Sequence, residues 1–357
     1  SGASFDAAKY DTPAEPSACF VSGTHILTSE GEVCVENLQV GDLLVTASGA
    51  LRPIKWIGSH HIHRMPQRAT LAAKLVWPIR ITQNAFAPDV PNRDLLVSPG
   101  HALAVDVMGL VFIQAEKLVN GTTIRQEPCS SLTYWHVELE THDVIISNNL
   151  TSESYLDVGN RAVLGLASSN TPATLADYAY PLIKNGPVIK AIRARLEARA
   201  LTLGWHQTQN DDMHLLVDGQ RLEPVISDKR VCFIFPASAQ NVQLVSHTFS
   251  PAECSGSNDQ RHLGVNMSDV HLTDGFGCSN TLSLDHPALA NQFHMEEARD
   301  GATWRWTQGL LNLESSLWAE CKGHAIFTFT KRIMSRKYWS APVIEIKNDN
   351  GKKMVYL

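Results

Sequence analysis

The chain has 357 residues, of which 44% are hydrophobic and 18% charged, with 30 basic against 36 acidic side chains. This is the composition of an ordinary globular protein, and it excludes a disordered, collagen-like or coiled-coil chain. The net charge of −6 argues against a nucleic-acid-binding surface, which needs a basic excess. At roughly 150 residues per domain, the length indicates about two domains.

Membrane-spanning and disulfide-rich classes are also disfavoured. No apolar run approaches the roughly 18 to 20 residues of a membrane span. The seven cysteines include no Cys-x-x-Cys pair, so a small disulfide scaffold is not expected. The chain opens at Ser1 without a signal-peptide pattern, which indicates a processed product or a fragment of a longer protein.

The first half of the chain has the pattern of a β domain. Residues 1–18 are small and polar without periodicity, and we interpret them as an extended leader. From residue 20 to residue 155, short runs rich in Val, Ile, Leu and Thr alternate with Gly, Asn, Asp and Pro, which predicts many short strands. The clearest lie at 24–27, 42–47, 54–57, 95–98, 111–113 and 137–139. With no long helix between them, a compact closed or pseudo-barrel β fold is favoured over a βαβ arrangement.

One helix is predicted before the strands return. A polar stretch at 168–172 is followed by an amphipathic segment at 187–204 that ends at Gly204. Its apolar residues recur at spacings of three and four: Val188, Ile192, Leu196, Ala200 and Leu203. This helix is interpreted as a hinge. Further strands are predicted at 215–217, 231–235, 242–249, 263–272, 325–330 and 343–346, so the second half is expected to be a β-sandwich or jelly roll.

Reactive side chains are concentrated in the first β region. Cys19 stands where the leader gives way to the strand pattern, although a lone cysteine there is more often a buried apolar residue. Ser98 ends an apolar strand and His101 follows a Pro-Gly turn, which would direct both into one pocket; an ordinary turn with an exposed His101 is the alternative. His136 and His142 flank a strand and turn.

Together these segments resemble the Hint domain, the autoprocessing fold shared by hedgehog C-terminal domains and inteins, and specifically its bacterial subfamily. The blocks that carry the resemblance are CFVSGTHILT at 19–28, VENLQVGDLLVT at 35–46, IKWIG at 54–58, DLLVSPGH at 94–101, LVNG at 118–121, and YWHVELETHD at 134–143 followed by ESYL at 153–156. The resemblance runs from Cys19 to about Asn160. It implies an all-β, pseudo-twofold, horseshoe-like fold.

The resemblance also implies chemistry at the Ala18–Cys19 bond. The thiol of Cys19 would attack the carbonyl of Ala18 and convert the amide into a thioester through a tetrahedral intermediate. His101 matches the residue that protonates the departing nitrogen. Ser98 matches the hydroxyl that orients the scissile peptide or donates to the oxyanion. No cofactor or metal is implied.

The same resemblance suggests roles for a second group near the end of the domain. His142 matches the late histidine that assists proton transfer, while Asp143 and His136 would tune its charge.

Two departures from the family's sequence pattern argue against protein splicing and against transfer to a sterol. No His-Asn dipeptide occurs in the chain, so protein splicing is not expected, and Asn149 is interpreted as part of a hairpin turn. The strand at 52–57 lacks the carboxylate that hedgehog proteins use for sterol transfer. Water or a small thiol or amine is therefore the expected acceptor of the upstream segment, which is the substrate.

The sequence also leaves two other functions open. One is a catalytically decayed Hint scaffold fused to a module that binds a glycan or surface, in which Trp304 and Trp306 form a sugar-stacking face; core packing of the two indoles is the competing interpretation. The other is a conventional hydrolase, disfavoured because the adjacent leader has a very high effective concentration at the thiol. The compartment is left open; a secreted or cell-surface bacterial protein, with its targeting signal absent from this chain, is one expectation.

The predicted domains are the leader at 1–18, the Hint domain at 19–160, a linker and helix at 161–210, and a β domain at 211–357. Two loose clusters were considered as metal sites, namely His60 with His61 and His63, and Cys254 with His262, His271 and Cys278. Neither has the ligand spacing of a known site, so no metal is predicted.

Overall fold

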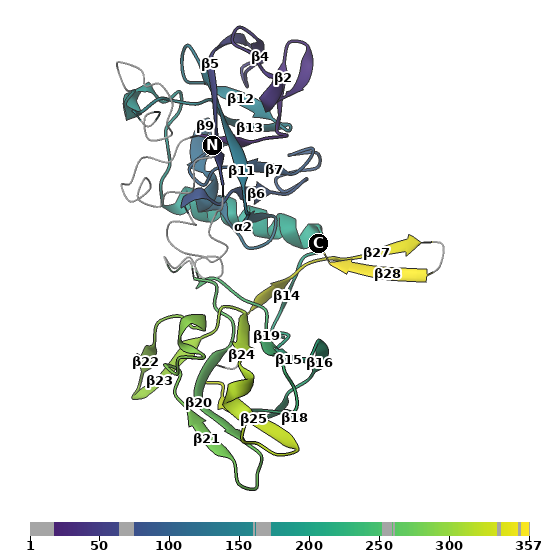
Figure 1. Cartoon of the computed structure of the whole chain (residues 1–357). Coiled ribbons are helices and arrows are strands. Elements are labelled where there is room, and N and C mark those ends of the chain that lie inside the picture. The colour runs from purple at the N-terminus through teal and green to yellow at the C-terminus, as the bar shows by residue number, and fades with distance from the viewer. Residues whose placement is uncertain are drawn as a thin grey trace. The chain divides into compact units, whose positions relative to one another are not determined.

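The computed structural model describes residues 18–63, 75–159, 161, 173–251, 259, 261–333, 337–348 and 351–356. The predicted leader therefore lies outside the described residues except for Ala18. The chain divides into two compact units, Ser1–Gly204 and Trp205–Leu357, which run from purple to teal and from green to yellow in Figure 1. Both units consist mainly of strands, as predicted. None of the helices in the described ranges has the length and apolar composition of a membrane span.

The first unit is built on one large antiparallel sheet. Its strands are β1 (Phe20–Val21), β2 (His25–Thr28), β3 (Gly31–Cys34), β4 (Leu43–Val45), β5 (Leu51–Ile62), β6 (Ile79–Ile81), β7 (Leu95–Val97), β8 (Ala102–Asp106), β9 (Leu110–Gln114), β10 (Ile124–Gln126), β11 (Leu132–Leu139), β12 (Val144–Ser147) and β13 (Leu150–Glu153). They pair in the order β10-β6-β7-β1-β11-β5-β4-β2-β12-β13-β8-β9, with β3 on β2. Short 3₁₀ helices are η2 (Val35–Asn37), η3 (Ala115–Leu118) and η4 (Leu175–Asp177).

Two strand pairings position the reactive residues. The short strand β1 lies between β7 and β11, with Phe20 opposite both Val97 and Trp135. Strand β5 pairs with β11 along most of its length, from Ile62 opposite Leu132 to Ile54 opposite Leu139 (Figure 1). Since side chains alternate between the two faces of a strand, these registers decide which histidines face Cys19.

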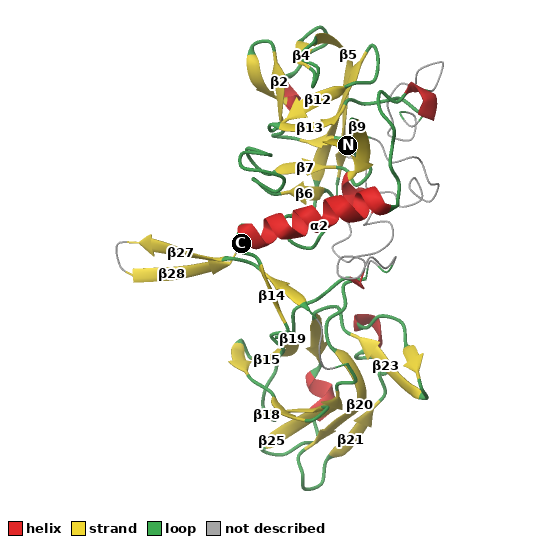
Figure 2. Ribbon diagram, turned by 180° about the vertical axis from the view of Figure 1, so that it is seen from behind, coloured by secondary structure: helices red, strands yellow, loops and turns green. Residues whose placement is uncertain are grey.

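The predicted helix is present as α2 (Pro187–Thr202), the long red helix of Figure 2. Pro187 occupies its first turn, where the missing N–H costs no hydrogen bond. Ile189, Ile192 and Leu196 pack into the main core of the first unit. The helix ends before Gly204, whose φ of +92° is a conformation that glycine adopts without strain.

The second unit contains two main sheets. Its strands are β14 (His206–Thr208), β15 (His214–Val217), β16 (Gln220–Leu222), β17 (Val225–Ser227), β18 (Arg230–Pro236), β19 (Val242–Val245), β20 (Asn266–Thr273), β21 (Ser279–Leu282), β22 (Glu297–Arg299), β23 (Ala302–Trp306), β24 (Leu310–Leu313), β25 (His324–Thr330), β26 (Tyr338–Ser340), β27 (Val343–Asn348) and β28 (Gly351–Tyr356), with η5 (Ala290–Gln292) and η6 (Ser315–Trp318). One sheet has the order β16-β15-β19-β24, and the other has the order β17-β18-β25-β20-β23-β22, with β21 on β20.

The two sheets share one core, which gives the second unit its sandwich character. Leu215 and Leu244 come from the first sheet, while Phe233, Val270 and Phe327 come from the second, and all five belong to the same buried cluster. The alternation of buried and exposed residues along β18 and β25 matches a strand with one face on a core. The prediction of an all-β chain with a sandwich-like second half is confirmed.

The tryptophan pair does not form an exposed surface. Trp304 and Trp306 do share one face of β23, but they are only 8% and 1% exposed. They pack with Phe249, Leu263 and Tyr338 in a separate buried cluster. The interpretation as a sugar-stacking face is therefore wrong, and core packing explains both residues.

The two histidine and cysteine clusters that the sequence offers as loose metal sites are not assembled in the described residues. Within the described ranges, no group of three or more His, Cys, Asp or Glu side chains is arranged to hold a metal. Cys254 lies outside the described residues, and His271 is hydrogen-bonded to Thr281.

Candidate active site

Ser98 holds the Ala18–Cys19 peptide. The backbone N–H of Cys19 donates to Ser98 Oγ over 3.2 Å, and the Ser98 N–H donates to the Cys19 carbonyl over 3.0 Å. Ser98 directly follows β7, which pairs with β1, so the sheet itself brings the two residues together. Because the hydroxyl meets the nitrogen of the Ala18–Cys19 bond, the geometry fits the orienting role predicted for Ser98. The Cys19 residue is only 2% exposed.

His136 lies between the carbonyl and the thiol that would react. Its Nδ1 is 3.1 Å from the carbonyl oxygen of Ala18, and its Nε2 is 3.8 Å from Cys19 Sγ. A carbonyl oxygen only accepts hydrogen bonds, so Nδ1 carries the proton and donates. In the neutral ring, Nε2 is then the basic nitrogen, and it faces the sulfur. One imidazole thus contacts both reacting groups.

The surroundings of His136 keep it neutral. Burial lowers the pKa of His136 to about 3, and His60 lowers it further, while the hydrogen bond to Ala18 opposes them. Desolvation acts in this direction because it disfavours the charged imidazolium. At neutral pH the ring therefore carries a single N–H, which is the state that the contacts with Ala18 and Cys19 require.

A second histidine, His60, contacts the His136 ring. Its Nδ1 lies 3.2 Å from His136 Nε2. Burial lowers the pKa of His60 to about 4, with a smaller contribution from the charge of His61. Sequence reasoning considered His60 only as part of a possible metal cluster. Strand alternation was the missed signal, because it places His60 on the same face of β5 as the buried Ile62 and opposite to His61.

His101 is completely buried next to Cys19. It lies in the turn between β7 and β8, and its ring packs edge-on against Phe20 at 4.5 Å between centroids. Among the described residues, neither ring nitrogen has a hydrogen bond of standard geometry. Burial lowers the pKa of His101 to about 3; the backbone of Cys19 is near enough to raise it in part, and His142 lowers it. The His101 ring is therefore buried beside the backbone of Cys19, where it is close to the nitrogen of the Ala18–Cys19 bond.

His142 forms a separate buried pair with Glu153. Its Nδ1 accepts the backbone N–H of Ala179 over 3.1 Å, and its Nε2 is 3.3 Å from Glu153 Oε2. Glu153 Oε1 in turn accepts the N–H of Ala102, the residue after His101, over 2.6 Å. Burial raises the pKa of Glu153, against the effect of His142. The polar contacts of His142 thus lie behind His101, and no such contact joins it to Cys19 or Ala18 within the described residues.

Asp143 makes its contacts elsewhere. Its Oδ2 is 3.6 Å from Arg52 Nε, and its Oδ1 accepts the N–H of Val144 over 2.8 Å. The structure thus brings together Cys19, Ser98, His101 and His136, and it places Asp143 in a partly exposed ion pair.

An aromatic wall covers one side of His136. The Tyr155 ring meets the His136 ring at 5.0 Å, Trp56 packs on Tyr155 at 5.6 Å, and the guanidinium of Arg161 lies 3.9 Å above the Trp56 ring. Arg161 also forms an ion pair with Glu138. Burial beside the Tyr155 and Trp56 rings lowers the pKa of His136, and the positive charge of Arg161 lowers it further. The motif pattern singled out none of them for this role.

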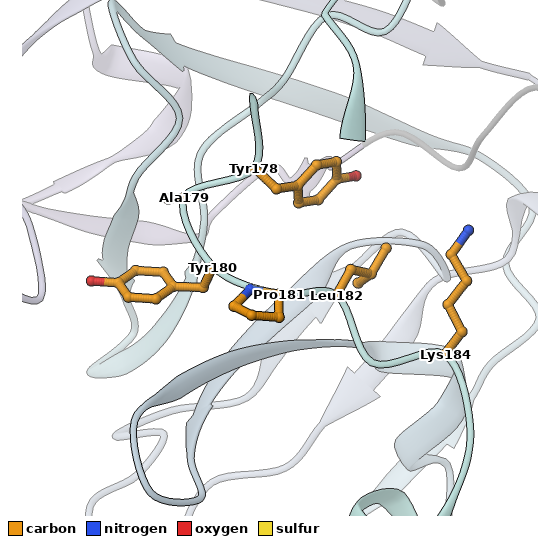
Figure 3. A pocket seen from close by; sticks show the side chains of 6 residues that line it. All are labelled: Tyr178, Ala179, Tyr180, Pro181, Leu182 and Lys184. Carbon is orange, nitrogen blue, oxygen red and sulfur yellow. The ribbon is translucent and has the colours of Figure 1, made fainter. Parts of the chain in front are cut away.

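A hollow of about 330 Å³ is lined by residues 178–182 and Lys184. Figure 3 shows its lining residues along one stretch of chain, with the rings of Tyr178 and Tyr180 pointing in opposite directions and Lys184 at the far end. Tyr178 packs edge-on against His142 at 4.9 Å. The stretch is held to β9 by hydrogen bonds between Phe112 and both Pro181 and Ile183.

The first unit is thus an all-β domain in which a buried thiol and two buried imidazoles surround the Ala18–Cys19 peptide bond. Residues 18–159 match the family model of the Hint domain, so this part of the chain is a Hint domain, as its motifs predicted. The match covers less than half of the chain. No curated protein matches the chain.

Several solved structures are similar over 38% of this chain. A bacterial intein-like domain from Clostridium thermocellum is 15% identical, with a TM-score of 0.28 and 97% of its own length covered. The gp41-1 intein is 14% identical, with a TM-score of 0.23 and 97% covered. The MchDnaB-1 intein is 12% identical, with a TM-score of 0.25 and 98% covered. At such scores, the fold assignment rests on the family match and the strand topology.

Proposed function

We propose that the Hint domain processes its own chain by an N-to-S acyl shift at the Ala18–Cys19 bond. One observation carries this proposal: the carbonyl oxygen of Ala18 and the sulfur of Cys19 face the two nitrogens of a single buried imidazole, at 3.1 and 3.8 Å. This arrangement provides a donor for the oxyanion and a base for the thiol at the same time.

The attack follows from the contacts of His136. The thiol of Cys19 gives its proton to Nε2, and the sulfur forms a bond with the carbonyl carbon of Ala18. The carbonyl oxygen becomes an oxyanion that accepts the hydrogen bond from Nδ1. Because His136 is cationic at that moment, this hydrogen bond is charge-assisted and strengthens as negative charge develops. Burial excludes water that would otherwise compete for the oxyanion.

The collapse of the tetrahedral intermediate breaks the bond between carbon and nitrogen. The departing nitrogen, held by Ser98, becomes an amine and needs one proton. His101, next to the Cys19 backbone, and the cationic His136 are the donors nearest to it. The thiol loses one proton and the nitrogen gains one, so the shift is an isomerisation that needs no oxidant or cofactor.

The thioester then reacts with an external nucleophile. Water or a small thiol or amine adds to the carbonyl carbon of Ala18, and the sulfur of Cys19 leaves with a proton. The segment that precedes Cys19 is released or transferred. This ending does not join flanking segments, in agreement with the absence of a His-Asn dipeptide.

Mass spectrometry tests the proposal directly. Incubation of the purified chain with dithiothreitol or hydroxylamine should remove the mass of residues 1–18, and hydroxylamine should leave a hydroxamate on Ala18. Cys19→Ala should stay at full length, whereas Cys34→Ala, which removes a half-buried thiol of the same unit, should cleave normally. An intact mass after prolonged incubation with both nucleophiles would instead support a decayed scaffold.

A further inference from the structure

We propose that His60 positions His136 as the outer member of a chain of two imidazoles that ends on the carbonyl of Ala18. This inference rests on the proposed acyl shift and adds a residue that no sequence motif assigns. His60 is a positioning residue, because its contact is with His136 and not with the bond that breaks.

The two rings lie edge to edge. Their planes are inclined by only 15°, and their centroids are 5.4 Å apart. That separation is too long for face-to-face stacking, in which the rings would be in van der Waals contact. It fits two nearly coplanar rings with one nitrogen of each pointing at the other, as the distance of 3.2 Å between Nδ1 of His60 and Nε2 of His136 confirms.

Proton counting then fixes the hydrogen on each ring. The carbonyl oxygen of Ala18 is an acceptor, so His136 carries its proton on Nδ1. The neutral ring has only one N–H, which leaves Nε2 as an acceptor. A hydrogen bond between the rings therefore requires the proton of His60 to be on Nδ1. The chain of donors runs from His60 to His136 and from His136 to the carbonyl.

This chain selects the reactive tautomer before the reaction begins. With the proton on Nε2, His136 would turn a lone pair toward the carbonyl oxygen and would have no base for the thiol. His60 disfavours that state because two N–H groups would then face each other. Sγ of Cys19 lies 3.8 Å from the same Nε2, so the hydrogen bond from His60 has to be given up when this nitrogen takes the proton of the thiol.

A substitution of His61 separates the effect of His60 on His136 from a general effect of changing this strand. His61 follows His60 in β5, is exposed, and contacts Thr133 Oγ1 over 2.7 Å. Its side chain lies on the opposite face of the strand, so it offers a matched control for substitution in the same strand.

The first experiment compares cleavage rates of the whole chain in dithiothreitol. His60→Phe removes the donor and should slow cleavage roughly 10- to 100-fold, the range typical when a partner that orients a functional histidine is lost. His60→Asn restores an N–H at the position of Nδ1 and should recover most of the rate. His61→Ala should cleave at the original rate. Cleavage of His60→Phe at the original rate would overturn the inference.

A second measurement does not depend on cleavage. In the Cys19→Ala chain, nitrogen-15 NMR of the histidine rings should show His60 and His136 both protonated at Nδ1. If His136 is protonated at Nε2, the inference is wrong even when the chain cleaves. If both tautomers are as expected but the unmodified chain never cleaves, the inference stands and the proposed acyl shift fails.

Discussion

At the scale of single residues, the distinctive feature is one imidazole that contacts both the carbonyl of Ala18 and the thiol of Cys19. A separate base and oxyanion donor would need two side chains to be desolvated and oriented. In this Hint domain, His136 contacts both groups from one position in β11, and Ser98 holds the nitrogen of the same peptide bond. Substitution of His136 should therefore affect the attack and the intermediate together.

We expect His136→Ala to abolish measurable cleavage. Loss of a general base typically costs about 10² to 10⁴ in rate, and the oxyanion donor is lost with it. The decay of the full-length mass in dithiothreitol measures the effect, with circular dichroism as a check of folding. His63→Ala, which removes an exposed imidazole of the same region, is the control. Equal rates for the two variants would remove His136 from the mechanism.

The buried histidines also make stability depend on pH. The pKa values of His101 and His136 are lowered to about 3, and that of His60 to about 4, whereas unfolded histidine has a pKa near 6.5. Between these values the unfolded chain binds protons that the folded chain does not. The free energy of unfolding is therefore highest above pH 6.5, where these histidines are neutral in both states. It decreases as the pH falls toward 4, by at most about 1.4 kcal/mol per pH unit for each histidine.

Urea unfolding of the Cys19→Ala chain between pH 7 and pH 5 would measure this slope. His60→Asn removes one of the three groups, so its stability should depend less steeply on pH. A slope that is identical in the two chains would mean that the pKa of His60 is the same in the folded and the unfolded chain.

At the scale of elements, helix α2 contains two leucines that should differ in their contribution to stability, because only one of them is buried. Leu196 is 2% exposed and belongs to the main core of the first unit, whereas Leu201 on the same helix is 54% exposed. Both positions are leucine in a helix, so intrinsic helix propensity affects them equally. Only packing against the sheet differs.

Leu196→Ala should destabilise the first unit by about 2 to 5 kcal/mol, because it removes apolar contacts and leaves a cavity. Leu201→Ala should change the free energy of unfolding by less than about 0.5 kcal/mol. Denaturant midpoints of the transition reported by the first unit provide the comparison. Similar midpoints for the two variants would show that α2 is not part of this core.

At the scale of the whole molecule, both units contain buried cysteines, but the groups that surround the sulfur atoms differ. The thiol of Cys19 faces a base and a carbonyl. In the second unit, Cys278 and Cys321 are buried with their sulfur atoms 2.8 Å apart, and the Asp274 carboxylate accepts backbone N–H groups from both Cys278 and Lys322. The segments on either side of this pair are therefore held in place.

Oxidised glutathione should join Cys278 and Cys321, with two thiols oxidised and glutathione disulfide reduced to two thiols. Burial raises the pKa of Cys321 to about 12, so the reaction should be slow at neutral pH and faster during refolding. Closing a loop of this length should stabilise the second unit by about 4 kcal/mol. Peptide mass mapping without reductant checks the link, and Cys321→Ser should abolish it. Full alkylation of both residues after oxidative refolding would contradict it.

The sequence by itself determined the family of the first β domain and predicted Ala18–Cys19 as the bond that would react. The blocks from Cys19 to Glu153 are local, and strand alternation and turn residues are local as well, so the all-β class and the helix near 187 could be predicted from spacing. The proximity of Ser98 to Cys19 was implied by the family resemblance. The tertiary structure alone decided which histidine meets the thiol. The contact of His136 with Ala18 and the contact of His60 with His136 depend on the register of β1, β5 and β11, which are far apart in the chain. For the same reason, the burial of Trp304 and Trp306 and the outward ion pair of Asp143 depend on packing that sequence spacing does not encode.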